Sequence, residues 1–326
     1  MSLPVFSVLR PRTLSEALAM LDQKANHLRI LAGGTDLLPS MRQRLFLPEY
    51  VLDMRRISEL MGIRASVHGV EIGALTTLGD IEHSDYLRQH YPLVTEAAKT
   101  VASPVIRNMG TIAGNICLDT RCLWYNQSLA WRKSCGFCLK KDGNLCHVAP
   151  GGTKCWAVFS GDTPPALLCL DAELEIMSAR STRRIPLRDF YTGEGDLYRR
   201  LEPNELISRV YLPSRSAEYR GMYRKLRVRG SIDYPLAGVA LAIKQQGGEI
   251  ADLRLALTAV NPAPTLVEGI AAVLQAATTP GELAAAIGEL AARAAKPLTT
   301  SALTPEYRRE MIRLYARRAV LEAARA

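Results

Sequence analysis

Long apolar runs, a cleavable leader and nucleic-acid recognition motifs are all missing from this 326-residue sequence. No stretch reaches the roughly 18 apolar residues that a membrane-spanning helix needs. The short apolar run between Pro4 and Arg10 is followed by no small-residue cleavage site. The net charge of +9 lies in short mixed patches without interleaved aromatic residues. We therefore expect a cytoplasmic protein that binds neither membrane nor nucleic acid.

The two commonest nucleotide-binding fingerprints, G-x-G-x-x-G and G-x-x-x-x-G-K-[ST], are absent as well. The sequence has instead two other glycine-bearing loops, Ala-Gly-Gly-Thr-Asp at 32–36 and Gly-Thr-Ile-Ala-Gly-Asn at 110–115. Glycine lets backbone N–H groups approach an anion, and Thr and Asn add further donors. The first loop also precedes an expected helix, whose N-terminus favours negative charge. Each loop alone also fits a tight turn, but the pair favours a dinucleotide site.

Cysteine is rare everywhere except in one stretch, where six of the seven lie between positions 117 and 155. Buried structural cysteines scatter along strands and helices, whereas clustered cysteines in a reducing compartment more often bind metal. The clustered residues are Cys117, Cys122, Cys135, Cys138, Cys146 and Cys155. Spacing alone allows tetrahedral zinc on the last four or an iron–sulfur cluster. His147 is a possible ligand, but with four cysteines available it is better explained as a loop residue.

Hydrophobic periodicity divides the rest of the chain into helices and strands of the α+β class. A hydrophobic fraction of 48% and a charged fraction of 22% are typical of globular proteins. The patterns predict helices over 13–25, 37–44, 81–89, 93–102, 267–277, 280–294 and 305–325, and strands over 28–32, 50–53, 70–75, 173–178, 206–212, 238–244 and 252–260. The polar, turn-rich run 213–218 predicts a domain boundary near Ser216.

Four segments carry a resemblance to a known family, at 28–41, 107–115, 160–168 and 305–311. They resemble the FAD-binding subunit of molybdenum hydroxylases, the xanthine dehydrogenase and carbon monoxide dehydrogenase family. The resemblance implies a two-lobed FAD-binding domain of the PCMH or vanillyl-alcohol-oxidase type over 1–216, with lobes of about 1–58 and 59–216. It also implies a C-terminal flavoprotein domain of α+β class over 217–326.

The sequence departs from the family pattern between Asn115 and Ser160, where about forty residues are inserted. This insertion, about 117–158, resembles the cluster-bearing loop in the β subunit of 4-hydroxybenzoyl-CoA reductases. That resemblance implies a [4Fe–4S] cluster held by Cys122, Cys138, Cys146 and Cys155, with Cys135 as the spare. Cys117 would be packed at the exit of the second flavin loop, and Cys169 would lie in the core. The two candidates for one ligand position, Cys122 and Cys135, are both kept for test.

The same resemblance implies which residues hold FAD. The two loops would line its pyrophosphate and ribose, and Asp162 would approach the flavin or its ribityl chain. Lys225 matches a family lysine near the cofactor, although a surface lysine in a basic strand is an equally good explanation. The full set is Arg29, Ile30, Leu31, Ala32, Gly33, Gly34, Thr35, Asp36, Val101, Ala102, Gly110, Thr111, Ile112, Ala113, Gly114, Asn115, Leu123, Asp162 and Lys225.

The implied activity is electron transfer within a larger molybdenum enzyme. Partners would be a large subunit with the molybdenum–pterin cofactor, a small subunit with two [2Fe–2S] clusters and a ferredoxin-like donor, assembled as a dimer of heterotrimers. Electrons would pass through the [4Fe–4S] cluster and FAD towards reductive dehydroxylation of 4-hydroxybenzoyl-CoA to benzoyl-CoA. The main alternative is an oxidative hydroxylase that acts on an N-heterocycle or aldehyde. A third is a zinc-loop scaffold or nucleic-acid-binding protein with a vestigial flavin site.

Overall fold

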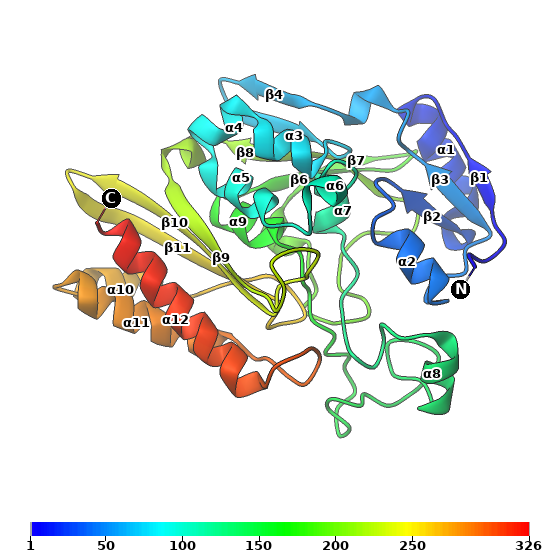
Figure 1. Cartoon of the computed structure of the whole chain (residues 1–326). Coiled ribbons are helices and arrows are strands. Elements are labelled where there is room, and N and C mark those ends of the chain that lie inside the picture. The colour runs from blue at the N-terminus through cyan, green and yellow to red at the C-terminus, as the bar shows by residue number, and fades with distance from the viewer. Residues whose placement is uncertain (1, 326) are drawn as a thin grey trace.

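The computed structural model describes residues 2–325 and contains three sheets (Figure 1). The first lobe is a parallel sheet of order β1-β3-β2 with two helices. Its elements are β1 (Ser7–Leu9), α1 (Leu14–Lys24), β2 (Leu28–Leu31), α2 (Leu37–Arg42) and β3 (Tyr50–Asp53). The Thr13 hydroxyl caps α1 by accepting from the Glu16 backbone N–H at 3.2 Å. The helices predicted over 13–25 and 37–44 are confirmed as α1 and α2, and the strands predicted over 28–32 and 50–53 as β2 and β3.

The second lobe is a five-stranded antiparallel sheet, of order β4-β5-β8-β6-β7, covered by short helices. Its strands are β4 (Ile63–Ser66), β5 (Gly69–Gly73), β6 (Glu173–Met177), β7 (Thr182–Pro186) and β8 (Leu206–Pro213). Its helices are α3 (Leu78–His83), α4 (Asp85–His90), α5 (Pro92–Lys99), α6 (Pro104–Arg107), α7 (Ile112–Ile116) and α9 (Thr163–Cys169). The single helix predicted over 81–89 is wrong, because Ser84 takes an extended conformation and caps α4.

The insertion leaves the second lobe after α7 and projects from the body of the molecule (Figure 1). It is irregular except for α8 (Leu129–Ser134), which the sequence patterns did not predict. The Arg132 side chain from α8 is buried and donates to the carbonyl oxygens of Gln43 at 3.2 Å and Arg44 at 3.0 Å. These bonds fasten the insertion to the end of α2, because orphan carbonyls at a helix C-terminus attract cationic donors.

The C-terminal domain is an antiparallel sheet of order β12-β11-β10-β9 with helices α10–α12. Its elements are β9 (Arg220–Leu226), β10 (Ala237–Gln246), β11 (Glu249–Thr258), β12 (Thr265–Leu266), α10 (Ile270–Ala276), α11 (Pro280–Ala294) and α12 (Pro305–Ala323). Short 3-10 turns complete the chain at Ala25–His27, Ser58–Leu60, Leu187–Asp189 and Ser214–Glu218. Across residues 2–325, no helix is both long and apolar enough to cross a bilayer.

Strand β10 explains how the C-terminal sheet is held against the second lobe. Its alternate residues point to opposite faces. Val239, Leu241 and Ile243 join the core beneath α11 and α12, while Ala240 and Ala242 join the core that contains α5 and α9. Small alanines let the lobe-two helices approach the sheet closely, so the sheet is buried on both faces. The α+β class and a separate C-terminal α+β domain are confirmed.

Arg308, in the Glu-Tyr-Arg-Arg segment of α12, is fully buried and faces carbonyl oxygens rather than a carboxylate. Its guanidinium donates to Leu236 O at 2.8 Å, Leu298 O at 2.8 Å and Ala259 O at 2.5 Å. Burial lowers the pKa of Arg308 to about 10, so the side chain stays charged at neutral pH. This one side chain therefore joins the start of α12 to three loops of the domain.

Candidate functional site

A cavity of about 780 Å³ separates the first lobe from the second and reaches the C-terminal domain. That volume is within the range of cofactor pockets. Both glycine loops line it, together with residues 196–207 and 232–234. The predicted FAD residues that line it are Arg29, Ile30, Ala32, Gly33, Gly34, Thr35, Asp36, Val101, Ala102, Gly110, Thr111, Ala113, Gly114, Asn115 and Asp162. We call this cavity the flavin pocket, after the cofactor that the sequence predicts for it.

The two glycine loops touch backbone to backbone. A Cβ on Gly33 would lie 2.6 Å from the Met109 carbonyl carbon and nearer still to its oxygen. The second loop is fixed in turn, because Gly110 O accepts from Leu78 N at 2.8 Å and Ile112 N donates to Thr76 O at 3.0 Å. Glycine at position 33 is therefore required by a close approach rather than by a turn.

Four predicted residues do not line the flavin pocket: Leu31, Ile112, Leu123 and Lys225. Ile112 is fully buried in the lobe-two core. Leu123 is 50% exposed on the insertion, where its N–H donates to Thr300 O at 2.8 Å. Lys225 lies one residue deeper than the pocket wall, behind Asp162.

Asp162, Lys225 and Tyr223 form a buried polar cluster under the pocket. Lys225 Nζ donates to Asp162 Oδ2 at 3.0 Å and to Thr100 O at 3.0 Å, and the Tyr223 hydroxyl donates to Asp162 Oδ1 at 2.8 Å. Burial raises the pKa of Asp162, and the neighbouring ammonium of Lys225 acts in the opposite direction. The Lys225 side chain is only 3% exposed, so the surface-lysine explanation is wrong.

We expect Lys225→Met to lower the free energy of unfolding by about 3–5 kcal/mol, because it leaves the Asp162 carboxylate buried without its counter-charge. Chemical denaturation measures the change. The control is Lys244→Met, which removes a partly exposed ion pair to Glu218 and should cost under about 1 kcal/mol. The double variant Asp162→Asn, Lys225→Met should recover part of the loss. An equal loss in the two lysine variants would contradict this account.

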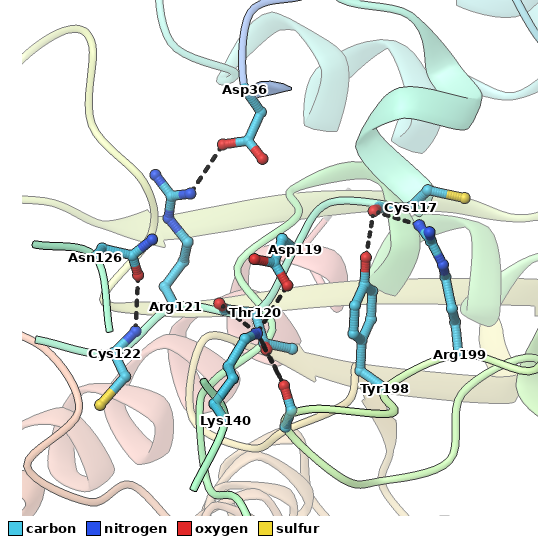
Figure 2. A network of polar contacts seen from close by, with 11 residues as sticks. Asp36, Cys117, Asp119, Thr120, Arg121, Cys122, Asn126, Lys140, Tyr198 and Arg199 are labelled. Carbon is cyan, nitrogen blue, oxygen red and sulfur yellow. Dashed lines mark hydrogen bonds and ion pairs between the residues drawn. The ribbon is translucent and has the colours of Figure 1, made fainter. Parts of the chain in front are cut away.

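A second polar group joins three parts of the chain at the pocket's edge. Arg121 of the insertion pairs with Asp36 of the first glycine loop at 2.8 Å, and its guanidinium lies 4.2 Å from the centre of the Tyr234 ring. The Tyr234 hydroxyl also donates to Asp36 Oδ1 at 3.0 Å. Figure 2 shows Arg121 reaching towards Asp36 from the irregular segment that leads to Cys122. The insertion is thus fixed to the flavin pocket itself.

Two arginines line the pocket without a direct ion pair, although the charge of Asp119 lies near enough to act on both. Within the described residues, neither Arg29 nor Arg199 has an acidic side chain at ion-pairing distance. Arg29 lies over the Phe46 ring at 4.8 Å, and burial, followed by the nearby charge of Arg199, lowers its pKa. Arg199 donates to Cys117 O at 3.0 Å (Figure 2). Two guanidinium groups without a bonded carboxylate could bind an anionic ligand.

Asp119 adds an acceptor that the sequence patterns missed. Its Oδ2 atom is buried in the pocket wall without a hydrogen-bond partner. A buried unpaired oxygen is costly unless a ligand hydroxyl or amine meets it. Asp119, Tyr198 and Arg199 belong to no recognisable pattern, because they come from two segments about 80 positions apart that meet at the pocket only in the folded chain.

Four cysteines of the insertion line one small second cavity, which we call the cysteine cavity. They are Cys122, Cys138, Cys146 and Cys155. Cys135 does not line it, since it ends α8, and Cys117 lines the flavin pocket instead. Cys169 is fully buried in the lobe-two core. All seven thiols are free.

The surroundings of the cysteine cavity are largely aromatic. Trp124, Tyr125, Trp156 and His147 line it. The His147 ring stacks on Trp124 at 4.2 Å, and its Nε2 lies 2.6 Å from Phe137 O, so Nε2 carries a proton and donates. Burial raises the pKa of Cys122 to about 11 and that of Cys155 to about 12. These thiols are neutral at pH 7 unless a metal supplies positive charge.

The spacing of these thiols bears on the kind of metal. In residues 2–325, no three Cys, His, Asp or Glu side chains are placed to hold a single metal ion. One zinc ion requires its sulfur ligands within about 2.3 Å of one point. An iron–sulfur cluster spreads its thiolates, because each binds a different iron atom. The four thiols that line one cavity are a donor set that either kind of centre can use.

Comparison with known proteins follows the same division of the chain. The FAD binding domain in molybdopterin dehydrogenase matches residues 4–215, and the CO dehydrogenase flavoprotein C-terminal domain matches residues 221–323. The chain belongs to the FAD-binding medium subunits of the xanthine dehydrogenase and carbon monoxide dehydrogenase family. It is therefore an oxidoreductase subunit with an FAD-binding domain.

Relatives of this medium-subunit family cover most of the chain. The glyceraldehyde dehydrogenase medium chain of Sulfolobus acidocaldarius is 33% identical over 80% of this chain and 78% of its own length. The carbon monoxide dehydrogenase medium chain of Afipia carboxidovorans is 30% identical over 98% and 96%. Carbon monoxide dehydrogenase from Hydrogenophaga pseudoflava superimposes with a TM-score of 0.80 at 27% identity, covering 99% of both chains.

Proposed function

We propose that this medium subunit carries a [4Fe–4S] cluster beside its FAD and conducts electrons from a ferredoxin-like donor towards a molybdenum subunit. That partner would reductively dehydroxylate 4-hydroxybenzoyl-CoA. The observation that carries the proposal is the cysteine cavity, in which four thiols of the insertion gather against the wall of the flavin pocket. FAD binding alone does not require these four thiols.

The flavin pocket fits FAD in size and in chemistry. The first glycine loop would supply backbone N–H groups, whereas most N–H groups of the second loop already donate within the protein. Arg29 and Arg199 would supply positive charge for a pyrophosphate. The unpaired Asp119 Oδ2 would accept from a hydroxyl or amino group of the ligand. Asp162 is held at the far wall by Lys225 and Tyr223. Leu31, Ile112 and Lys225 would support these groups from behind.

The cysteine cavity fits a cluster through its donor set. Cys122, Cys138, Cys146 and Cys155 would be the ligands. Trp124 and Trp156 would shield the site from water, which is one of the influences on the potential of such clusters. When bound, FAD exchanges one or two electrons and a cluster exchanges one at a time, so the pair would convert between the two.

The reaction itself would occur elsewhere in the complex. A large subunit would hold the molybdenum–pterin cofactor and a small subunit two [2Fe–2S] clusters, in a cytoplasmic dimer of heterotrimers. Two electrons and two protons would convert 4-hydroxybenzoyl-CoA into benzoyl-CoA and water. A one-electron entry site outside the flavin suits a ferredoxin, because a ferredoxin donates one electron at a time and a cluster accepts one at a time.

The second candidate is the FAD subunit of an oxidative hydroxylase. The names of the relatives favour it, since they are dehydrogenases of glyceraldehyde, carbon monoxide and nicotinate. In that case electrons would leave through the flavin after oxidation of an aldehyde or N-heterocycle on the partner subunit.

Metal, sulfide and flavin analysis of the purified complex tests the proposal. We expect one FAD and four iron atoms per chain beyond the iron of the small subunit, with bleaching of the flavin by reduced ferredoxin. Addition of 4-hydroxybenzoyl-CoA should then reoxidise the flavin. Zinc in place of iron would reject the cluster, and flavin reduction by an aldehyde or N-heterocycle alone would favour the second candidate.

A further inference from the structure

Lys140 occupies the wall between the flavin pocket and the cysteine cavity. Within residues 2–325, it and Tyr125 are the two residues that line both spaces. The Lys140 side chain is only 5% exposed, and its ammonium lies 4.4 Å from the centre of the Tyr125 ring. A buried cation is costly unless it is fully bonded. Its position therefore calls for an explanation.

The ammonium is fully bonded. Lys140 Nζ donates to Asp119 Oδ1 at 2.7 Å, to Thr120 O at 3.0 Å and to Gly195 O at 2.9 Å, and it also contacts the Thr120 hydroxyl. Figure 2 shows Lys140 pointing at Asp119 and Thr120 in the middle of the run from Cys117 to Cys122. An ammonium has three protons, and each of them has an acceptor here.

These bonds join the segments that carry three of the four cavity cysteines. Asp119 and Thr120 lead directly to Cys122. Lys140 itself belongs to the turn of Cys138, whose N–H donates to Lys141 O at 3.3 Å. Gly195 N donates to Cys155 O at 2.9 Å, and a Cβ on Gly195 would lie 2.8 Å from Cys155 Sγ. Loss of the ammonium would loosen all three segments at once.

Charge gives Lys140 a second effect. Its ammonium and the Asp119 carboxylate balance each other, so the wall is close to neutral as it stands. Each electron added to a cluster makes the cluster more negative, and nearby charge shifts its potential. Removing the lysine leaves a negative wall that disfavours reduction. Removing only the carboxylate charge leaves a positive wall that favours it.

We propose that Lys140 is a positioning residue that fastens the cysteine cavity to the flavin pocket and, with Asp119, sets the reduction potential of the cluster between them. This rests on the proposed function, because it needs the cluster to be present. Two features of the Lys140 side chain support this role: it lies between the two cavities, and its charge is paired with that of Asp119. The cluster ligands remain the four cysteines.

The test is a redox titration of the cluster, followed by electron paramagnetic resonance, in the purified complex. Lys140→Met should lower the ratio of reduced to oxidised cluster at fixed potential at least tenfold, a shift of about 59 mV to more negative potential. Asp119→Asn, which keeps the ammonium, should shift it in the opposite direction. Lys140→Arg should remain close to the wild type. Lys133→Met, an exposed lysine on α8, is the matched control and should change nothing.

The sign of the two shifts decides the inference. If Lys140→Met loses its iron, that supports the fastening role, and Asp119→Asn then decides the electrostatic one. Shifts of the same sign, or changes under threefold in both variants with iron retained, would overturn the role of Lys140. A wild-type complex without four additional irons per chain would instead overturn the proposed function, so the two failures are distinguishable.

Discussion

Replacing Cys122 by serine is expected to reduce the iron bound by the insertion to less than a quarter of the wild-type amount. Cys122 lines the cysteine cavity with Cys138, Cys146 and Cys155. A serine hydroxyl is a harder and weaker ligand for iron than a thiolate, and three remaining thiolates leave one iron exposed to water. Iron and sulfide analysis of the purified complex measures the loss, and the visible absorbance of the cluster should fall with it.

The matched control for this variant is Cys135→Ser. Cys135 comes from the same insertion, but it ends α8 and does not line the cavity. It should keep its full iron content. If the Cys122 variant kept its iron and the Cys135 variant lost it, the ligand set would be Cys135, Cys138, Cys146 and Cys155. Loss in both variants would indicate that the insertion fails to fold after any substitution.

Replacing Gly33 by alanine is expected to lower the FAD content of the purified protein more than tenfold, a loss of at least about 1.4 kcal/mol in binding. The added methyl group would overlap the Met109 carbonyl, which is backbone and cannot rotate away. The two glycine loops would have to separate, and the backbone N–H groups of the first loop would move away from the position that we propose for the pyrophosphate. Flavin absorbance relative to protein measures the effect.

Gly230→Ala serves as the control for this variant. A Cβ at that position meets nothing within 4 Å, and the backbone is not left-handed there. FAD content should be unchanged. Full flavin occupancy in the Gly33 variant would show that the loops can part without cost, and the pyrophosphate would then have to be held by Arg29 and Arg199 rather than by the loops.

The elements that local sequence predicted well are those whose signals lie close together in the chain. Thr13 and Glu16 fixed the start of α1, and the predicted bounds of β3 and α11 match the structure. The single helix predicted over 81–89 was wrong for a reason that also lies in the local sequence. Ser84 caps the helix that follows it, but in a helical pattern it cannot be told from any other polar residue. The strands β4 and β7 were missed because their polar residues hide the two-residue alternation.

The roles of residues whose partners lie far away in the chain could not be predicted from local sequence. Lys225 fits a surface position by sequence, yet pairing of β9 with β10 buries it beside Asp162, 63 positions earlier. No short sequence pattern points to the partners of Lys140 and Arg121. Their partners Gly195 and Asp36 lie 55 and 85 positions away.

The sequence by itself determined the family, through two glycine loops whose chemistry is local, and it marked the insertion by crowding six cysteines into one stretch. Only the tertiary structure decided which four of those thiols share a cavity, and that this cavity shares a wall with the flavin pocket. The reason is physical. Residue types and short spacings specify turns and caps, whereas the meeting of side chains from different lobes depends on how sheets and helices pack, which no short stretch of sequence encodes.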